Sequence, residues 1–137
     1  KDFFEKLCNK QLPFKLEIKT WQDLKEWFAF FIHLQDDICC ERGCPMATIG
    51  YELTAKDDSI RQEINHIFEL TTQPIVGFFV HLKAQGKLKP SADPRSLAEL
   101  CFIVMQGGLL VSKINKDTAS FKTSVSHLFA YLKSFLK

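Results

Sequence analysis

Apolar side chains that recur at helical spacing are the feature that most constrains the fold of this chain. The longest stretch of this kind runs from Asp57 to Gly86. The 137 residues include 13 phenylalanines but only 6 glycines and 5 prolines, so core-forming side chains are plentiful and turn residues are few. That balance favours long helices over many short strands. We therefore predict an all-α fold, an antiparallel helical bundle of about six helices, formed as a single domain over residues 1–137.

Capping residues predict where the first helices begin. Residues 1–12 place their apolar side chains on one helical face, and this helix should end before the proline that follows. Thr20, with Asp23 three residues later, is typical of a capping box, here at the start of an aromatic helix that reaches Leu34. A proline after a cysteine then predicts a short helix over residues 45–53.

The long helix from Asp57 to Gly86 contains one proline. Pro74 removes a backbone hydrogen bond and clashes with the preceding turn, which predicts a kink. We expect the hydroxyl groups of Thr71 and Thr72 to help satisfy the carbonyl groups that the proline leaves without a partner. Gly86 is a fitting residue for the end of the helix.

The last two helices follow equally clear start signals. The Asp93–Pro94 pair opens a helix that is apolar almost all round, and Asp117 or Thr118 caps the final one. Gly107 and Gly108 lie inside the first of these helices, where each glycine costs about 1 kcal/mol relative to alanine. The simplest reason for two such residues is the close approach of another helix.

The aromatic helix that follows Thr20 carries rings on nearly all sides. Such a pattern indicates either burial on more than one side or a face that lines a cavity, and ordinary core packing explains it as well. Helix bundles often place ligand sites between helices, so we expect a small hydrophobic effector between this helix and the kinked one. The candidate ligand-binding residues are Trp27, Phe31, Cys44, Phe68, Ile75, Phe78 and Met105.

Cys44 directly precedes a proline and is a candidate N-cap. A thiol there faces the positive end of the helix dipole, which favours the thiolate and makes the sulfur more reactive. One interpretation is a sensor of oxidants or electrophiles in which Cys39 or Cys40 resolves the modified thiol. The other is a small apolar residue at a turn, the role of most free cysteines. The cluster lacks a second ligand pair at metal-site spacing, so we predict neither a metal nor another cofactor.

Several functions are disfavoured by composition and motifs. The net charge is only +2 and no basic stripe is interleaved with aromatics, so this chain alone should not bind DNA. No phosphate-binding loop and no HExxH or GxSxG motif occurs, so we expect no enzyme activity. The apolar run from Leu100 to Val111 is too short to span a membrane. An odd number of cysteines, 5, without a disulfide framework is typical of a reducing compartment, and we expect a cytoplasmic protein.

Three segments from Gly43 onward form a set that is specific in order and spacing. They are GCPMATIGYEL followed by AKDDSIRQEI, then LKAQGKLKPSADPRSLAEL, then VMQGGLLVSKINKD. Together they resemble the C-terminal domain of the TetR family of bacterial transcriptional repressors. The segment that begins at Gly43 resembles that family's short sixth helix and the start of its long seventh. The middle segment resembles the end of the seventh helix and the start of the eighth, and the last one resembles the eighth helix with its following turn.

This resemblance implies an effector-sensing domain that forms homodimers, with the last two helices of each subunit packed in a four-helix bundle. The dimer-interface residues it implies here are Leu97, Leu100, Val104, Gly107, Gly108, Val111, Phe121, Val125, Leu128, Phe129 and Leu132. In the family, an N-terminal helix-turn-helix domain binds operator DNA and a small molecule bound in the C-terminal core releases it. Residues 1–12 resemble the tail of the helix that connects the two domains, so we expect the natural protein to extend upstream. A helical interaction module without a ligand is the alternative.

Overall fold

The computed structural model describes residues 17–38, 40–41 and 43–137. Within these ranges the chain forms five helices and no strand, apart from one isolated antiparallel bridge between Leu88 and Leu136. The helices are α2 (Trp21–Asp37), α3 (Pro45–Tyr51), α4 (Asp58–Ala84), α5 (Pro94–Asn115) and α6 (Ala119–Lys133). The predicted all-α fold is confirmed, with five described helices against the expected six. The helix expected over residues 1–12 lies outside the described residues.

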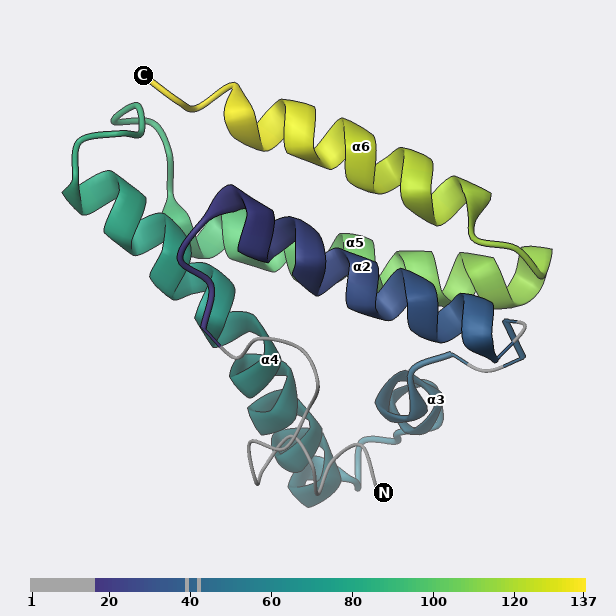
Figure 1. Cartoon of the computed structure of the whole chain (residues 1–137). Coiled ribbons are helices and arrows are strands. Elements are labelled where there is room, and N and C mark those ends of the chain that lie inside the picture. Colours follow the sequence, from purple (N-terminus) through teal and green to yellow (C-terminus); the bar gives the residue numbers. More distant parts are fainter. Residues whose placement is uncertain (1–16, 39, 42) are drawn as a thin grey trace.

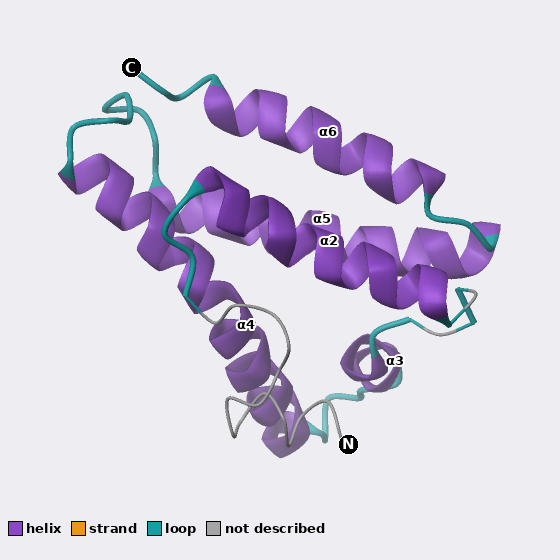
Figure 2. Ribbon diagram, in the orientation of Figure 1, coloured by secondary structure: helices purple, strands orange, loops and turns teal. Residues whose placement is uncertain are grey.

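Helix α5 is the centre of the domain, because it packs against α4, α6 and α2. Figure 1 shows α2 and α6 running along α5, while α4 crosses them diagonally. The short α3 lies between the end of α2 and the first part of α4, as the purple helices of Figure 2 also show. Four helices therefore surround one region of the interior near α3.

Two of the predicted helix starts, at Thr20 and Asp93, are confirmed by side-chain capping hydrogen bonds. The backbone N–H of Asp23 donates to Thr20 Oγ1 over 3.0 Å, and the Thr20 N–H donates to Asp23 Oδ2 over 3.2 Å, which completes the capping box. The side chain of Asp93 accepts the backbone N–H of Arg95 at the start of α5. At the other end of α4, Gly86 adopts a φ of +72°, a left-handed conformation that favours glycine.

The proline in α4 does not interrupt the helix. Helix α4 continues through Pro74 for 27 residues. Thr71 Oγ1 donates to the carbonyl of Ile67 over 2.9 Å, and Thr72 Oγ1 donates to the carbonyl of Phe68 over 2.7 Å. These carbonyls lie before that of Leu70, four residues ahead of the proline, which is the one left without its N–H donor. The expectation that the two hydroxyls replace the lost bond was therefore wrong.

The glycine pair in α5 has two different environments. A Cβ on Gly108 would lie 2.3 Å from a ring carbon of Phe121, so α6 approaches α5 of the same chain more closely than any other residue would allow. Around Gly107 no atom of the described residues lies within 4 Å of such a Cβ. The predicted close approach of a helix is confirmed at Gly108 alone.

The apolar character of α5 follows from its central position. By length and composition this 22-residue helix could cross a membrane, which corrects the expectation drawn from residues 100–111 alone. Its buried face, however, packs in the core of the domain. The buried residues of α5 are Leu97, Ala98, Cys101, Met105, Gly108, Leu109 and Ser112.

Candidate functional site: an uncharged cavity between four helices

A cavity of about 400 Å³ lies where α2, α3, α4 and α5 meet. Volumes of this order are typical of pockets that hold small molecules. None of the described residues that line it is charged. They are Phe31, Leu34, Gln35, Ile38, Gly43, Cys44, Pro45, Met46, Ile67, Phe68, Thr71, Phe102, Met105, Gln106 and Leu109.

The wall offers four polar side chains, and two of them already have partners. Gln35 is buried, and its Nε2 donates to the carbonyl of Leu109 over 3.0 Å, which joins α2 to α5. Thr71 Oγ1 is held by its own helix. The half-buried Gln106 and Cys44 complete the polar set. Because an ion inside such a wall would lose its hydration without gaining a counter-charge, the cavity disfavours charged ligands.

The structure brings four of the seven candidate ligand-binding residues to this cavity. Phe31, Cys44, Phe68 and Met105 line it, and Phe68 packs against Phe102 with ring centroids 4.8 Å apart. The remaining three, Trp27, Ile75 and Phe78, do not line it. All three are almost fully buried in the main core. They point into the region where α2, α4 and α5 lie closest, and neighbouring rings fill that space.

The two described cysteines of the predicted redox cluster, Cys40 and Cys44, lie in different surroundings. Cys44 is the N-cap residue of α3 as predicted, but its side chain makes no capping hydrogen bond. Cys40 is buried and lines a different hollow, beside the turn between α5 and α6. Cys39 lies outside the described residues. Among the residues that the structure describes, no group of three or more potential metal ligands occurs.

Two polar contacts were not anticipated from the sequence. Gln35 occupies a buried position on the same helical stripe as Phe28, Phe31 and Ile32, and a polar residue in an apolar stripe is the signal that could have identified it. Asp36, at the end of α2, accepts a hydrogen bond from Thr118 Oγ1 over 2.9 Å. This second contact ties the end of α2 to the start of α6.

The predicted dimer-interface residues fall into three groups. Five of them are buried in the core of their own chain, because α6 packs on α5 at Gly108, and they are not available to a partner. These are Leu97, Gly108, Phe121, Leu128 and Leu132. Val125 and Phe129 border a groove between α6 and α2. Leu100 and Val104 are half-buried, whereas Gly107 and Val111 are exposed.

The outer face of α5 carries an exposed apolar stripe. Ile103 and Ile114 are 65% and 72% exposed, and Leu110 and Val111 are about 40% exposed. Gly107 lies in the middle of these residues, on the same side of the helix. We call these five residues the α5 stripe.

Residues 21–128 match a protein family described as "Tetracyclin repressor-like, C-terminal domain". The chain belongs to this family. The match includes all four helices that surround the cavity and most of α6. Regulators of this family act as DNA-binding dimers with small-molecule effectors. The predicted resemblance is thereby confirmed.

Two curated relatives are transcriptional regulators. The HTH-type transcriptional repressor DhaR of Mycobacterium sp. is 27% identical over 94 residues, which cover 69% of this chain and 46% of that protein. The transcriptional regulator AcuR of Cereibacter sphaeroides is 30% identical over 73 residues, 53% of this chain and 33% of that protein. The chain thus spans less than half the length of either relative. No solved structure matches it.

Proposed function

We propose that this chain is the effector-sensing and homodimerisation domain of a cytoplasmic bacterial transcriptional repressor. A small, uncharged and largely apolar molecule binds in the cavity between α2, α3, α4 and α5. Its binding controls the attachment of a helix-turn-helix domain, outside this chain, to operator DNA. The family membership and the repressor name of one relative support the regulatory part of this proposal.

The observation that carries the ligand class is that none of the described residues around the cavity is charged. Phenylalanine, leucine and methionine side chains make up 7 of its 15 lining residues, and Gln106 supplies an amide that could orient a hydroxyl or carbonyl group. An effector in the cavity would also contact a helix that can change its position. The cavity is bordered by Pro45 and Met46 of α3, a helix of only 7 residues that has no buried residue of its own. A ligand that packs against α3 would therefore reposition it at low cost.

A thermal-shift screen of uncharged apolar compounds tests the ligand class. Binding to the folded state alone raises the melting temperature, so at least one compound should stabilise the wild-type protein. The Met46→Trp variant fills the cavity from α3 and should lose that shift. Ile49→Trp, on an exposed position of the same helix that does not line the cavity, is the matched control and should keep it. Equal shifts in both variants would place the ligand elsewhere.

The dimerisation part of the proposal rests on the α5 stripe. Exposed apolar residues that cluster on one face mark an interaction site, and Gly107 among them would let a partner helix approach closely. Ile103→Lys should convert a dimer into a monomer in light scattering. Val80→Lys, which replaces an apolar residue 51% exposed on α4, is the control and should leave the mass unchanged. A wild-type monomer would count against the dimer.

A second candidate mechanism keeps the same domain but uses Cys44 as a covalent sensor of electrophiles. The observation in its favour is that this half-buried thiol lines the cavity, where an apolar electrophile would be held beside it. The alkylation rate of Cys44, measured against pH in a variant that keeps only this cysteine, tests the mechanism. A rate no faster than that of a small free thiol would leave Cys44 with a packing role alone. A dimer that binds no compound and shows no reactive thiol would instead be a plain interaction module.

A further inference from the structure

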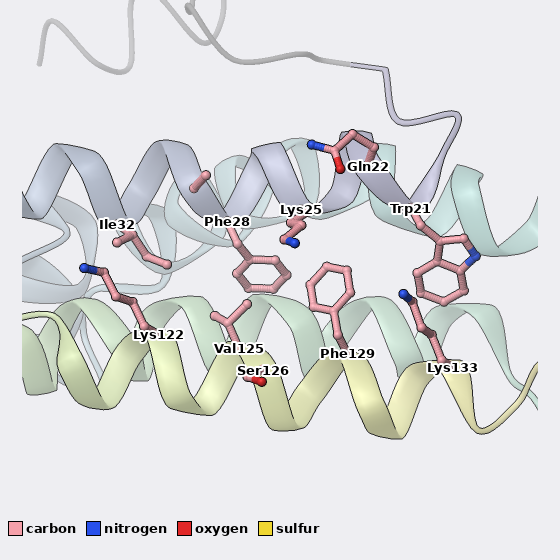
Figure 3. A pocket seen from close by; sticks show the side chains of 11 residues that line it. Trp21, Gln22, Lys25, Phe28, Ile32, Lys122, Val125, Ser126, Phe129 and Lys133 are labelled. Carbon is pink, nitrogen blue, oxygen red and sulfur yellow. The ribbon is translucent and has the colours of Figure 1, made fainter.

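A second hollow, of about 420 Å³, lies on the opposite side of α2 from the effector cavity, between α2 and α6. It arises because α6 packs most closely on α5, through Gly108 and Phe121, which leaves a gap beside α2. Its floor is aromatic. The rings of Phe28 and Phe129 meet edge to face with centroids 5.9 Å apart, and Figure 3 shows them side by side between the two helices. We call this hollow the α2–α6 groove.

The α2–α6 groove differs from the effector cavity in its charge. Lys25 of α2 and Lys122 and Lys133 of α6 line it, and none of the described residues that line it is acidic. In Figure 3, Lys122 and Lys133 extend from α6 toward α2 at opposite ends of the aromatic floor. The chain as a whole has a net charge of only +2, so three cations around one aromatic groove are a local excess.

The lysines are largely available to a ligand. Within the described part of the chain, neither Lys25 nor Lys133 forms an ion pair, and Lys133 lies 5.8 Å from the ring of Trp21. Lys122 has one carboxylate neighbour, Asp36, at the long distance of 3.9 Å. An exposed pair at that distance is weak. All three ammonium groups can therefore turn toward an anion in the groove.

We propose that the α2–α6 groove binds amphipathic carboxylates, small molecules that carry one anionic group on an apolar chain or ring. The apolar part packs on Trp21, Phe28 and Phe129, and the carboxylate is neutralised by the lysines at the rim. This site is separate from the effector cavity and selects the opposite ligand class. It does not depend on the proposed effector function, since the groove shares no lining residue with the cavity.

Isothermal titration with decanoate, and with uncharged decanol as the matched ligand, tests the proposal. The groove variant combines Lys25→Gln, Lys122→Gln and Lys133→Gln. The control variant removes the same charge from exposed positions away from the groove, through Lys56→Gln, Lys89→Gln and Lys137→Gln. Decanoate should bind the wild type and the control equally and the groove variant about tenfold more weakly. Raising the ionic strength should weaken decanoate binding, and decanol binding should depend on neither change.

Two spectroscopic signals locate the bound anion. The chain has 2 tryptophans, of which Trp21 lines the groove and Trp27 is buried, so decanoate should change a fluorescence signal that Trp21→Phe removes. It also has 2 methionines, Met46 and Met105, and both line the effector cavity. Their methyl resonances should stay in place when decanoate binds. No binding to the wild type, equal affinity in the groove variant, or shifted methionine signals with an unchanged Trp21 would each overturn the proposal.

Discussion

The two ends of the core differ although the same three helices, α2, α4 and α5, build both. At one end Trp27, Phe28, Ile75, Phe78 and Phe79 fill the interior, each at most 2% exposed, and we call this the solid end. At the other end Phe31, Phe68 and Met105 border a cavity, and we call this the hollow end. Both ends are rich in aromatic residues. Composition therefore does not decide which of them can hold a ligand.

The difference comes from how the helices are arranged. At the solid end rings from α2 and α4 interlock, for example Trp21 with Phe78 at 5.2 Å and with Phe79 at 6.0 Å between centroids. At the hollow end α4 slants away from α2, and among the described helices the short α3 lies between them (Figure 1). A helix of 7 residues is too small to fill that space. The hollow end therefore combines an apolar wall with a movable boundary.

The largest expected effect comes from truncating one ring at each end. Phe79→Ala removes a fully buried ring from the solid end and should lower the free energy of unfolding by about 3–5 kcal/mol. Phe68→Ala removes a half-buried ring beside space that is already empty, so its cost should be less than half as large. Urea denaturation of both variants measures the difference. Equal losses would mean that the two ends are packed alike.

The glycine pair tests how closely α6 packs on α5. Gly108→Ala would force Phe121 out of its position, and we expect a loss of about 1–3 kcal/mol in the free energy of unfolding. Gly107→Ala meets no described atom within the same chain and should leave the monomer unchanged or stabilise it by up to about 1 kcal/mol. If Gly107→Ala instead weakens the dimer, the partner helix crosses at this residue.

The buried thiol of Cys101 makes the free energy of unfolding depend on pH in the alkaline range. Burial raises the pKa of this thiol from 9.0 to about 12. Below pH 9 both folded and unfolded chains keep the proton, whereas above it only the unfolded chain releases it. Stability is therefore present below pH 9 and falls by about 1.4 kcal/mol for each further pH unit until about pH 12. Cys101→Ala should lose this alkaline slope, and an unchanged slope would mean that water reaches the thiol.

The smallest effect is expected at the ion pair beside the hollow end. Arg95 donates a hydrogen bond to Glu69 over 2.6 Å, which lowers the pKa of this carboxyl below its ordinary value of 4.5. The resulting stability is present above pH 4.5 and is lost as pH falls through the lowered pKa. Glu69→Gln should therefore be slightly less stable than the wild type at neutral pH and equal to it in acid. If the two proteins still differed in stability in acid, the charge of Glu69 would not be the whole cause.

Helix boundaries were predictable because caps and prolines act locally. Thr20, Asp93 and Gly86 form the expected contacts or backbone conformation within a few residues of themselves. The cavity was predictable only in part. Periodicity tells which side of α2 faces inward, but not whether a ring on that side is enclosed by other side chains, as at Trp27, or also borders a cavity, as at Phe31.

The dimer face shows the same limit. The family resemblance implied an interface at Phe121 and Leu128, yet these residues are buried in the core of their own chain. A stripe of apolar residues does not specify whether the surface that covers it belongs to the same chain or to a partner. Once the helices are placed, apolar residues that pack within the chain can be told apart from those that stay exposed for a partner. The α5 stripe is the exposed group.

The most direct test of the effector cavity uses the two methionine methyl groups. Met46 of α3 and Met105 of α5 lie on different walls of the cavity, and the chain contains no other methionine. In a protein labelled with ¹³C at the methionine methyls, titration with an uncharged apolar compound that stabilises the domain should shift both resonances together. A compound that stabilises the domain and moves neither resonance would contradict the assignment of the cavity as the effector site.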